Sequence, residues 1–250
     1  MKRTLLVLDF DGVICDSIDE CFVSSWIAWH RLNGLSLPGS LGVELRARFA
    51  ELRPFIRSGE DYVVIQDLLA AGRRVATQAE FDAALDACGP EGMGRLKDVF
   101  YEARGDLLAS DRPYWLALNR VYPHVGPPLA AVASRTDTVV LSTKKSEFIV
   151  EILAANGIAI PLDRVLYTGS RAKVDIITGM LGPDDRALLV DDQIDHLLAC
   201  RDPRIDVRLA LWGYIKPEWL TQNPGMPRVS AEGLAELLAP WLTRPPRADA

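Results

Sequence analysis

The chain has few cysteines and histidines. Its 250 residues include four cysteines and three histidines. The cysteines show no C-x-x-C spacing, and the histidines at positions 30, 124 and 196 are scattered, so no zinc site or other transition-metal cluster is indicated. Unpaired cysteines without a disulfide pattern are typical of a reducing compartment, and we expect a cytoplasmic protein.

The chain also lacks an excess of positive charge and a long apolar segment. Lysine and arginine number 28 against 34 aspartates and glutamates, a formal net charge of -6. A nucleic acid polymer is therefore not expected as a partner. The apolar part of the N-terminus is short and interrupted by acids, which argues against a signal peptide, and no stretch approaches the length of a membrane span. The composition, 49% hydrophobic and 25% charged, is that of a globular protein with its own core.

The informative feature is a set of three short apolar runs that each end on polar side chains. The run from Thr4 ends on Asp9, with a second acid at Asp11. The two later runs end on Ser142 and Thr143, and on Asp191 and Asp192. Charges beside an apolar core cost free energy unless they are paired or bind a metal, and open α/β sheets place ligands at the carboxyl ends of their strands. The pattern therefore predicts a functional site.

In order, the segments DFDGV, DTVVLSTK, a lysine at position 173 and ALLVDD resemble the four motifs of the haloacid dehalogenase-like (HAD) hydrolases. The overall layout is similar to that of the phosphoglycolate phosphatase-like members with an α-helical cap. The resemblance implies an α/β fold: a Rossmann-like, three-layer core around a parallel sheet, with an inserted all-helical cap domain.

The resemblance also implies roles for individual residues. Asp9 would be the nucleophile that attacks phosphorus, and Asp11 the general acid/base. Ser142, Lys173 and the backbone amides after Asp11 would bind the phosphoryl group. The expected Mg²⁺ ligands are Asp9, Asp11 through its backbone carbonyl, Asp191 and Asp192.

Some of these assignments have competitors. Asp195 could replace Asp192 as the second acid of the fourth motif, although we prefer Asp192. Lys144 and Lys145 compete with Lys173, because a lysine shortly after the second motif is also seen in relatives. Ser142 could simply cap the following helix.

The domain organisation follows from the spacing of apolar residues and from helix signals. Two capping boxes, Ser17 with Glu20 and Thr77 with Glu80, mark helix starts, and no convincing strand occurs between residues 39 and 122. We expect a core of residues 1–16 and 123–243, a helical cap of residues 17–122 and a disordered tail of residues 244–250. Within the cap, the candidates for substrate contact are Arg46, Arg48, Arg53, Arg57, Tyr62 and Arg104.

The predicted function is a magnesium-dependent phosphatase that hydrolyses a small phosphorylated metabolite through an aspartyl-phosphate intermediate. The presence of Asp11 favours phosphoryl chemistry over dehalogenation. A phosphomutase of the same family shares every motif and stays open as an alternative. The third hypothesis is a non-enzymatic protein that binds a phosphorylated metabolite.

Overall fold

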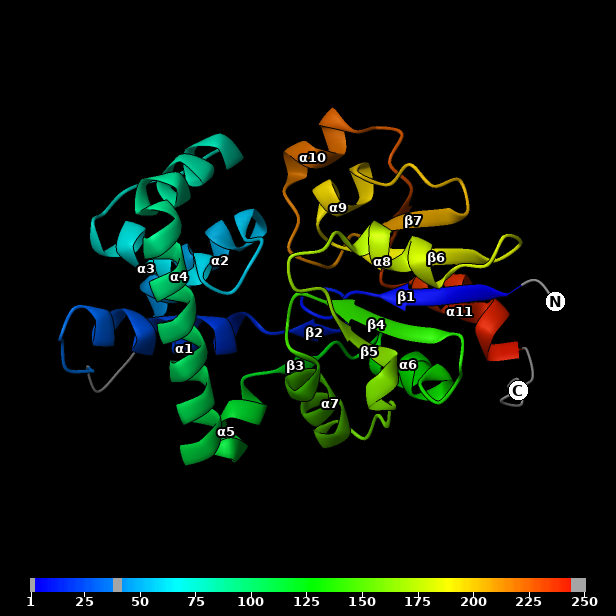
Figure 1. The fold of residues 1–250 in the computed structure, drawn as a ribbon, viewed down its shortest axis with the longest axis horizontal. Coiled ribbons are helices and arrows are strands. Elements are labelled where there is room, and N and C mark those ends of the chain that lie inside the picture. The colour runs from blue at the N-terminus through cyan, green and yellow to red at the C-terminus, as the bar shows by residue number, and fades with distance from the viewer. Residues whose placement is uncertain (1–2, 38–41, 244–250) are drawn as a thin grey trace. The chain divides into compact units, whose positions relative to one another are not determined.

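The computed structural model of the chain describes residues 3–37 and 42–243, and the expected tail at 244–250 lies outside them. Contacts divide the chain into two compact units. The first, the α/β unit, comprises Met1–Asp16 and Arg120–Ala250, and the second, the helical unit, comprises Ser17–Asn119 (Figure 1). Each unit is described by itself.

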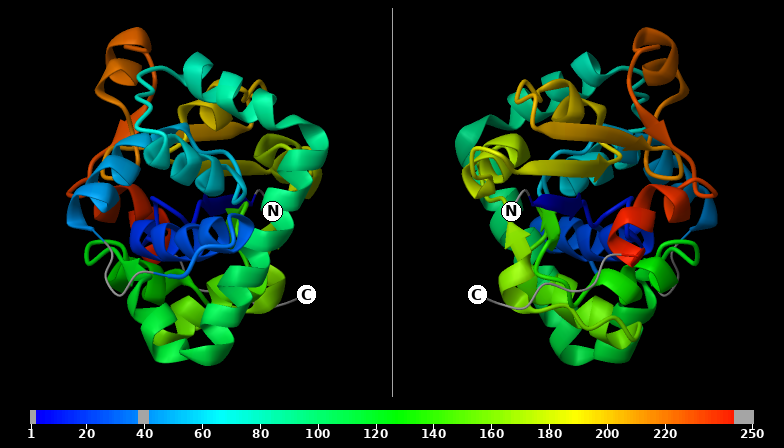
Figure 2. Two further views of the ribbon diagram at one scale, coloured as in Figure 1. Left: turned by 90° about the vertical axis from the view of Figure 1, so that its left-hand side faces the viewer. Right: turned by 90° about the vertical axis from the view of Figure 1, so that its right-hand side faces the viewer.

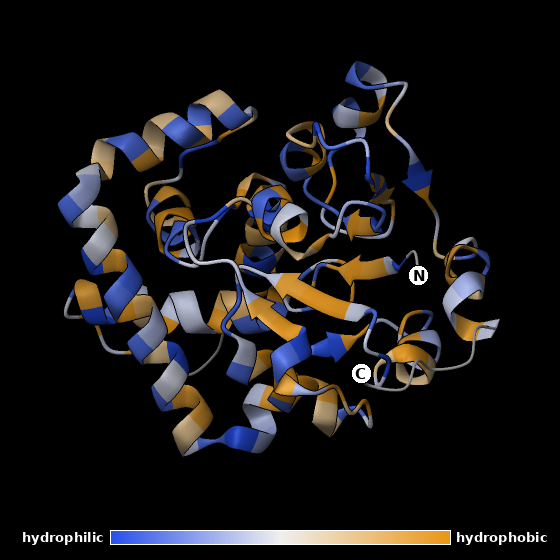
Figure 3. Cartoon of the chain, turned by 45° about the vertical axis from the view of Figure 1, so that its right-hand side comes forward, coloured by the Kyte–Doolittle hydropathy of each residue, from blue (hydrophilic) through white to orange (hydrophobic). Residues whose placement is uncertain are grey.

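A six-stranded sheet forms the centre of the α/β unit, in the order β5-β4-β1-β6-β7-β8, and every neighbouring pair is parallel. The strands are β1 Thr4–Leu8, β4 Thr138–Ser142, β5 Val165–Tyr167, β6 Arg186–Asp191, β7 Ile205–Ala210 and β8 Arg228–Val229. The inner strands are mainly apolar (Figure 3). Strands of this kind are buried on both faces, so the sheet needs helices on each side.

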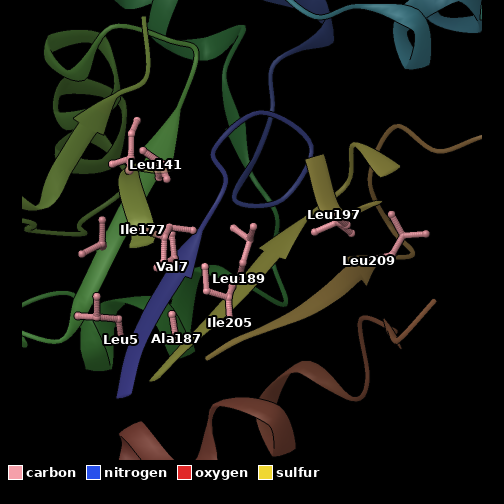
Figure 4. Close-up of a cluster of buried hydrophobic side chains, with 11 residues drawn as sticks. Leu5, Val7, Leu141, Ile177, Ala187, Leu189, Leu197, Ile205 and Leu209 are labelled. Atoms are coloured by element: carbon pink, nitrogen blue, oxygen red, sulfur yellow. The ribbon is translucent and has the colours of Figure 1, made fainter. Parts of the chain in front are cut away.

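Helices supply that cover on both faces. They are α6 Gly126–Val132, α7 Ser146–Ala155, α8 Lys173–Met180, α9 Ile194–Leu198, α10 Pro217–Gln222 and α11 Leu234–Thr243, with a 3₁₀ turn at Leu162–Arg164. On one face, Ile177 of α8 and Leu197 of α9 pack in a cluster with Val7 and Leu189 of the sheet (Figure 4). Helices α6 and α11 contact each other and lie on the other side. The predicted three-layer α/β core is confirmed.

Four short elements of this unit were not predicted. β2 Cys15–Asp16 pairs antiparallel with β3 Arg120–Val121, where the chain passes between the two units. The other two are β8, which has two residues, and α10, which has six. Two-residue strands carry no periodicity, so the sequence pattern gives no signal for them. Strand β7 ends at Ala210, and the Trp212 side chain that follows it donates to the carbonyl of Val13, in the segment after β1.

Only helices are described in the helical unit: α1 Ile18–Leu32, α2 Val43–Leu52, a 3₁₀ turn Arg53–Phe55, α3 Asp61–Ala70, α4 Gln78–Ser110 and α5 Arg112–Ala117. Helices α1 and α4 pack side by side (Figures 1 and 2). Helix α4 is kinked at Gly89, where φ is 64°. None of the described helices is both long and apolar enough to cross a membrane.

The two predicted capping boxes have different outcomes. Thr77 accepts a hydrogen bond from the backbone N–H of Glu80, and the Glu80 carboxylate accepts one from the N–H of Thr77, so this box is confirmed. The box at Ser17 is wrong, because the Ser17 side chain makes no capping bond. The Glu20 carboxylate is buried and binds the guanidinium of Arg104 instead.

Candidate active site

The polar ends of three strands meet at one edge of the sheet. Strands β4, β1 and β6 are neighbours and parallel, so their carboxyl ends lie together. Ser142 ends β4, Asp191 ends β6, and Asp9 directly follows β1, with its backbone N–H donating to the carbonyl of Val190 at 3.0 Å. The topology therefore brings together residues more than 180 positions apart.

Three carboxylates form a compact acid cluster at this edge. Asp9, Asp191 and Asp192 are 6%, 0% and 0% exposed, and one oxygen of each lies within 4.8 Å of the others. Asp195, the competing acid of the fourth motif, is exposed and lies outside the cluster. The structure thus places the preferred residue of the two, Asp192, beside Asp9 and Asp191.

A buried lysine joins two of these acids. The Lys173 Nζ lies 2.9 Å from Asp9 Oδ1 and 2.7 Å from Asp191 Oδ2. Burial alone would lower the lysine's pKa, but the two carboxylates outweigh it and the pKa is raised, so Lys173 is a cation at neutral pH. His196 was missed at the sequence level; its Nδ1 lies 3.0 Å from Asp191 Oδ2.

The pKa values of Asp9 and Asp191 are shifted in opposite directions. Burial raises the pKa of Asp9 to about 6; Lys173 acts against the rise, and Asp191 adds to it. Burial would also raise the pKa of Asp191, but Lys173 and His196 more than offset this, and the pKa lies below its ordinary value. Asp191 is therefore the firmly ionised member, and Asp9 titrates closer to neutral pH, so a further cation nearby would favour its ionised form.

A second lysine serves the other acid of the first motif. Lys144 is 3% exposed, and its Nζ lies 3.2 Å from Asp11 Oδ1. The backbone N–H of the same lysine donates to Ser142 Oγ at 3.2 Å. Lys145, the other competitor, is exposed. Lys173 therefore pairs with Asp9 and Lys144 with Asp11, so the two lysines do not compete for one role.

Two glycines allow the chain to pack closely around Asp192. Gly12 has φ of +91°, and a Cβ built on it would lie 2.1 Å from Asp192 Oδ2. A Cβ on Gly213 would lie 2.3 Å from the Cβ of Asp192. The N–H of Gly12 donates to the carbonyl of Cys15, so this amide, one of those expected to bind a phosphoryl group, already has an acceptor. Gly213 was missed, although a glycine three residues after a strand was a usable signal.

The cap residues proposed for substrate contact differ in exposure. Arg104 is 2% exposed and pairs with Glu20, and Tyr62 is 5% exposed and stacks on Phe100. Neither side chain has the free surface that the hypothesis requires, so the structure does not support these two. Arg48 is half-buried and lines a cavity of about 630 Å³ within the helical unit.

The acid cluster suits a hard divalent cation. Its donors are all carboxylate oxygens, which are the ligands that Mg²⁺ prefers. Three buried carboxylates gather here, with the Lys173 ammonium paired to Asp9 and Asp191, so a divalent ion would offset the negative charge that the cluster concentrates. The carboxylate of Asp11 lies outside the cluster; its expected contribution is through the backbone carbonyl.

Comparison with known proteins identifies the fold. No protein-family model matches the chain, and no curated protein matches its sequence. Solved structures do match. A candidate phosphoglycolate phosphatase from Lactobacillus delbrueckii subsp. bulgaricus is 17% identical, with a TM-score of 0.57 over 95% of this chain and 99% of that one. A haloacid dehalogenase-like hydrolase from Streptococcus pneumoniae, SP0104, is 14% identical, with a TM-score of 0.57 over 96% and 98%.

The chain has a haloacid dehalogenase-like fold. The predicted resemblance is thereby confirmed for the fold. Protein Tyrosine Kinase A of Mycobacterium tuberculosis also matches, at 18% identity and a TM-score of 0.53 over 95% of this chain and 98% of that one. Because structures with such different names share the HAD-like fold, the reaction has to be argued from the site itself.

Proposed function

We propose that the chain is a HAD-family phosphatase that hydrolyses a small phosphate monoester, with Mg²⁺ as cofactor. The observation that carries the proposal is the buried cluster of Asp9, Asp191 and Asp192, joined by Lys173 and flanked by the Asp11–Lys144 pair. The residues proposed as nucleophile, acid/base and metal ligands all lie at or shortly after the carboxyl ends of β1 and β6, which are neighbouring strands. The proposal includes a cytoplasmic location, which rests on the cysteine pattern alone.

Asp9 is suited to attack phosphorus. The Phe10 N–H and the Lys173 ammonium both bind Oδ1 of Asp9, at 2.7 Å and 2.9 Å. These contacts hold the carboxylate in place and leave its second oxygen, Oδ2, to form the bond to phosphorus. The product of that step is an aspartyl-phosphate, which water then hydrolyses.

Asp11 is suited to move the proton. Its carboxylate is separate from the acid cluster, and Lys144 holds it at 3.2 Å. In the first step a protonated Asp11 donates to the leaving alkoxide, and in the second it accepts a proton from the attacking water. Ser142 and Lys173, at the same strand ends, are the proposed ligands of the phosphoryl oxygens.

The cation supplies charge neutralisation between two anions, the carboxylate nucleophile and the phosphate monoester. Asp9, Asp191 and Asp192 would hold it with their side chains, and Asp11 with its carbonyl oxygen. We further propose that the helical unit, predicted as residues 17–122, acts as a cap that excludes water from the reaction and selects the metabolite.

The test is phosphate release from a panel of small phosphate monoesters with Mg²⁺, using the wild-type chain, Asp9→Asn and Asp195→Asn. Asp195→Asn is the matched control, because it removes an exposed acid near the cluster. We expect turnover in the wild type and the control, and none above background in Asp9→Asn. Turnover that requires a bisphosphate would instead indicate the phosphomutase, and metabolite binding without turnover a binding protein. Wild-type activity in Asp9→Asn would refute the assignment of the nucleophile.

A further inference from the structure

The loop after β7 packs tightly against the loop after β1. The indole N–H of Trp212 donates to the carbonyl of Val13 at 3.0 Å. A Cβ on Gly213 would lie 2.7 Å from the carbonyl oxygen of Gly12, so no side chain fits at that point. The two loops, about 200 residues apart in sequence, are thus joined by a hydrogen bond from a side chain to a backbone carbonyl and by a close approach of their backbones at Gly12 and Gly213.

Tyr214, the next residue of this loop, binds two aspartates with different parts of its structure. Its backbone N–H donates to Asp192 Oδ2 at 2.7 Å. Its phenol O–H donates to Asp16 Oδ1 at 2.8 Å. One residue thus links a member of the acid cluster to the end of β2.

Asp16 occupies a special place in the chain. It is the last residue of the α/β unit before the chain enters the helical unit, and it pairs in register with Arg120, where the chain returns. The same two side chains form an ion pair of 3.5 Å. The phenol of Tyr214 is therefore bonded to the crossing between the units.

We propose that Tyr214 is a positioning residue that couples this crossing to the orientation of the Asp192 carboxylate. The inference rests on the proposed function, since it takes Asp192 as a metal ligand. The carboxylate is oriented by the Tyr214 N–H, and the position of that N–H is set by the phenol's bond to Asp16. Metal ligands depend on such outer hydrogen bonds for their orientation, and the coupling would carry movement of the crossing to the metal site.

The direct test is the affinity of the full chain for Mg²⁺ alone, measured by titration calorimetry. Loss of a hydrogen bond to a metal ligand typically costs 10- to 100-fold in affinity; the phenol acts one bond further out, so we expect Tyr214→Phe to weaken binding roughly 3- to 10-fold. Tyr114→Phe is the matched control, because that tyrosine is 42% exposed on α5 in the helical unit. It should leave the affinity unchanged.

Variants of Asp16 show whether Mg²⁺ affinity depends on the hydrogen bond from the Tyr214 phenol or on the negative charge of Asp16. Asp16→Ala should weaken Mg²⁺ binding as Tyr214→Phe does, whereas Asp16→Asn keeps an oxygen acceptor and should restore most of the affinity. The double variant Tyr214→Phe/Asp16→Ala should bind no more weakly than Asp16→Ala alone, because Asp16→Ala has already removed the bond that Tyr214→Phe removes. Equal effects of Asp16→Asn and Asp16→Ala, or additive losses, would overturn the coupling.

A second measurement does not depend on metal. Amide hydrogen exchange at residue 214 reports the bond to Asp192, and it should be faster in metal-free Tyr214→Phe than in the wild type. Unchanged exchange, or wild-type Mg²⁺ affinity in Tyr214→Phe, would overturn the inference while the proposed function stands. If the wild type binds no Mg²⁺, the proposed function fails, and exchange alone decides whether Tyr214 links the two aspartates.

Discussion

Removing Arg104 should destabilise the helical unit far more than removing an arginine from an exposed ion pair on the same helices. The Nε and Nη2 atoms of Arg104 on α4 donate to the two oxygens of Glu20 on α1, at 2.7 Å and 2.8 Å. The two side chains are 3% and 0% exposed. Burial would lower the pKa of Arg104, but Glu20 outweighs this effect and the pKa is raised, so the guanidinium stays charged beside the Glu20 carboxylate.

The expected loss in the free energy of unfolding follows from the Glu20 carboxylate, which stays buried when Arg104 is replaced. In Arg104→Met, Glu20 keeps neutral donors, including the Ser24 hydroxyl at 2.7 Å, but it loses its buried cation. Breaking a buried pair in this way typically costs about 3–5 kcal/mol. The control is Arg31→Met, because Arg31 on α1 binds Asp106 on α4 at 2.8 Å with both side chains more than a third exposed. Exposed pairs contribute about 0–1 kcal/mol.

Urea unfolding gives the total change in the free energy of unfolding, and native-state amide exchange of α1 and α4 assigns it to the helical unit. The double variant Glu20→Leu/Arg104→Met should recover much of the loss, since it leaves no buried charge. A loss in Arg104→Met as small as that in Arg31→Met would refute the reasoning. So would a raised KM at unchanged stability, which would return Arg104 to the substrate contacts.

Further outcomes follow from the site and from one helix start. Asp11→Asn should slow turnover by roughly 10²–10⁴-fold, and an aryl ester with a good leaving group should rescue the first step in part; equal loss on good and poor leaving groups, in steady-state assays, would count against the acid role. Mg²⁺ should be required and Ca²⁺ should support turnover poorly, because Ca²⁺ takes more oxygen ligands; activity in chelator would contradict this. Gly213→Ala should weaken Mg²⁺ affinity in calorimetry by displacing Asp192, whose Cβ lies 2.3 Å from the added methyl group. Thr77→Ala should cost roughly 1 kcal/mol in urea unfolding, as expected for a lost N-cap, and Thr77→Ser should cost little.

The inner strands of the parallel core were predictable because each of them carries its own signal. A buried parallel strand is a continuous apolar run, and the runs ending at Asp9, Ser142 and Asp191 are separated by segments of helical spacing. The carboxyl ends of neighbouring parallel strands lie at one edge, so the meeting of these side chains follows from the topology. The order of the strands in the sheet cannot be predicted from these runs; it follows only from the resemblance to a known fold.

What the sequence did not reveal depends on contacts between distant segments. Ser17 and Glu20 have the spacing of a capping box, and only the presence of Arg104 on another helix shows why Glu20 is buried. Tyr214 follows a strand like many loop residues, and its two bonds reach positions 16 and 192. Local sequence patterns indicate helices and strand ends, but they do not indicate which distant residue a side chain contacts after tertiary packing.

The choice between Asp192 and Asp195 shows how packing decides a question that spacing leaves open. Either acid fits the fourth motif, but Asp192 directly follows β6, and its side chain occupies space that a Cβ on Gly12 or Gly213 would fill. Asp195 lies on the first turn of α9 and is exposed. A carboxylate in water has no need of a cation, whereas a third carboxylate buried beside Asp9 and Asp191 does. The burial of Asp192 is therefore the strongest physical argument in this chain for a bound divalent ion.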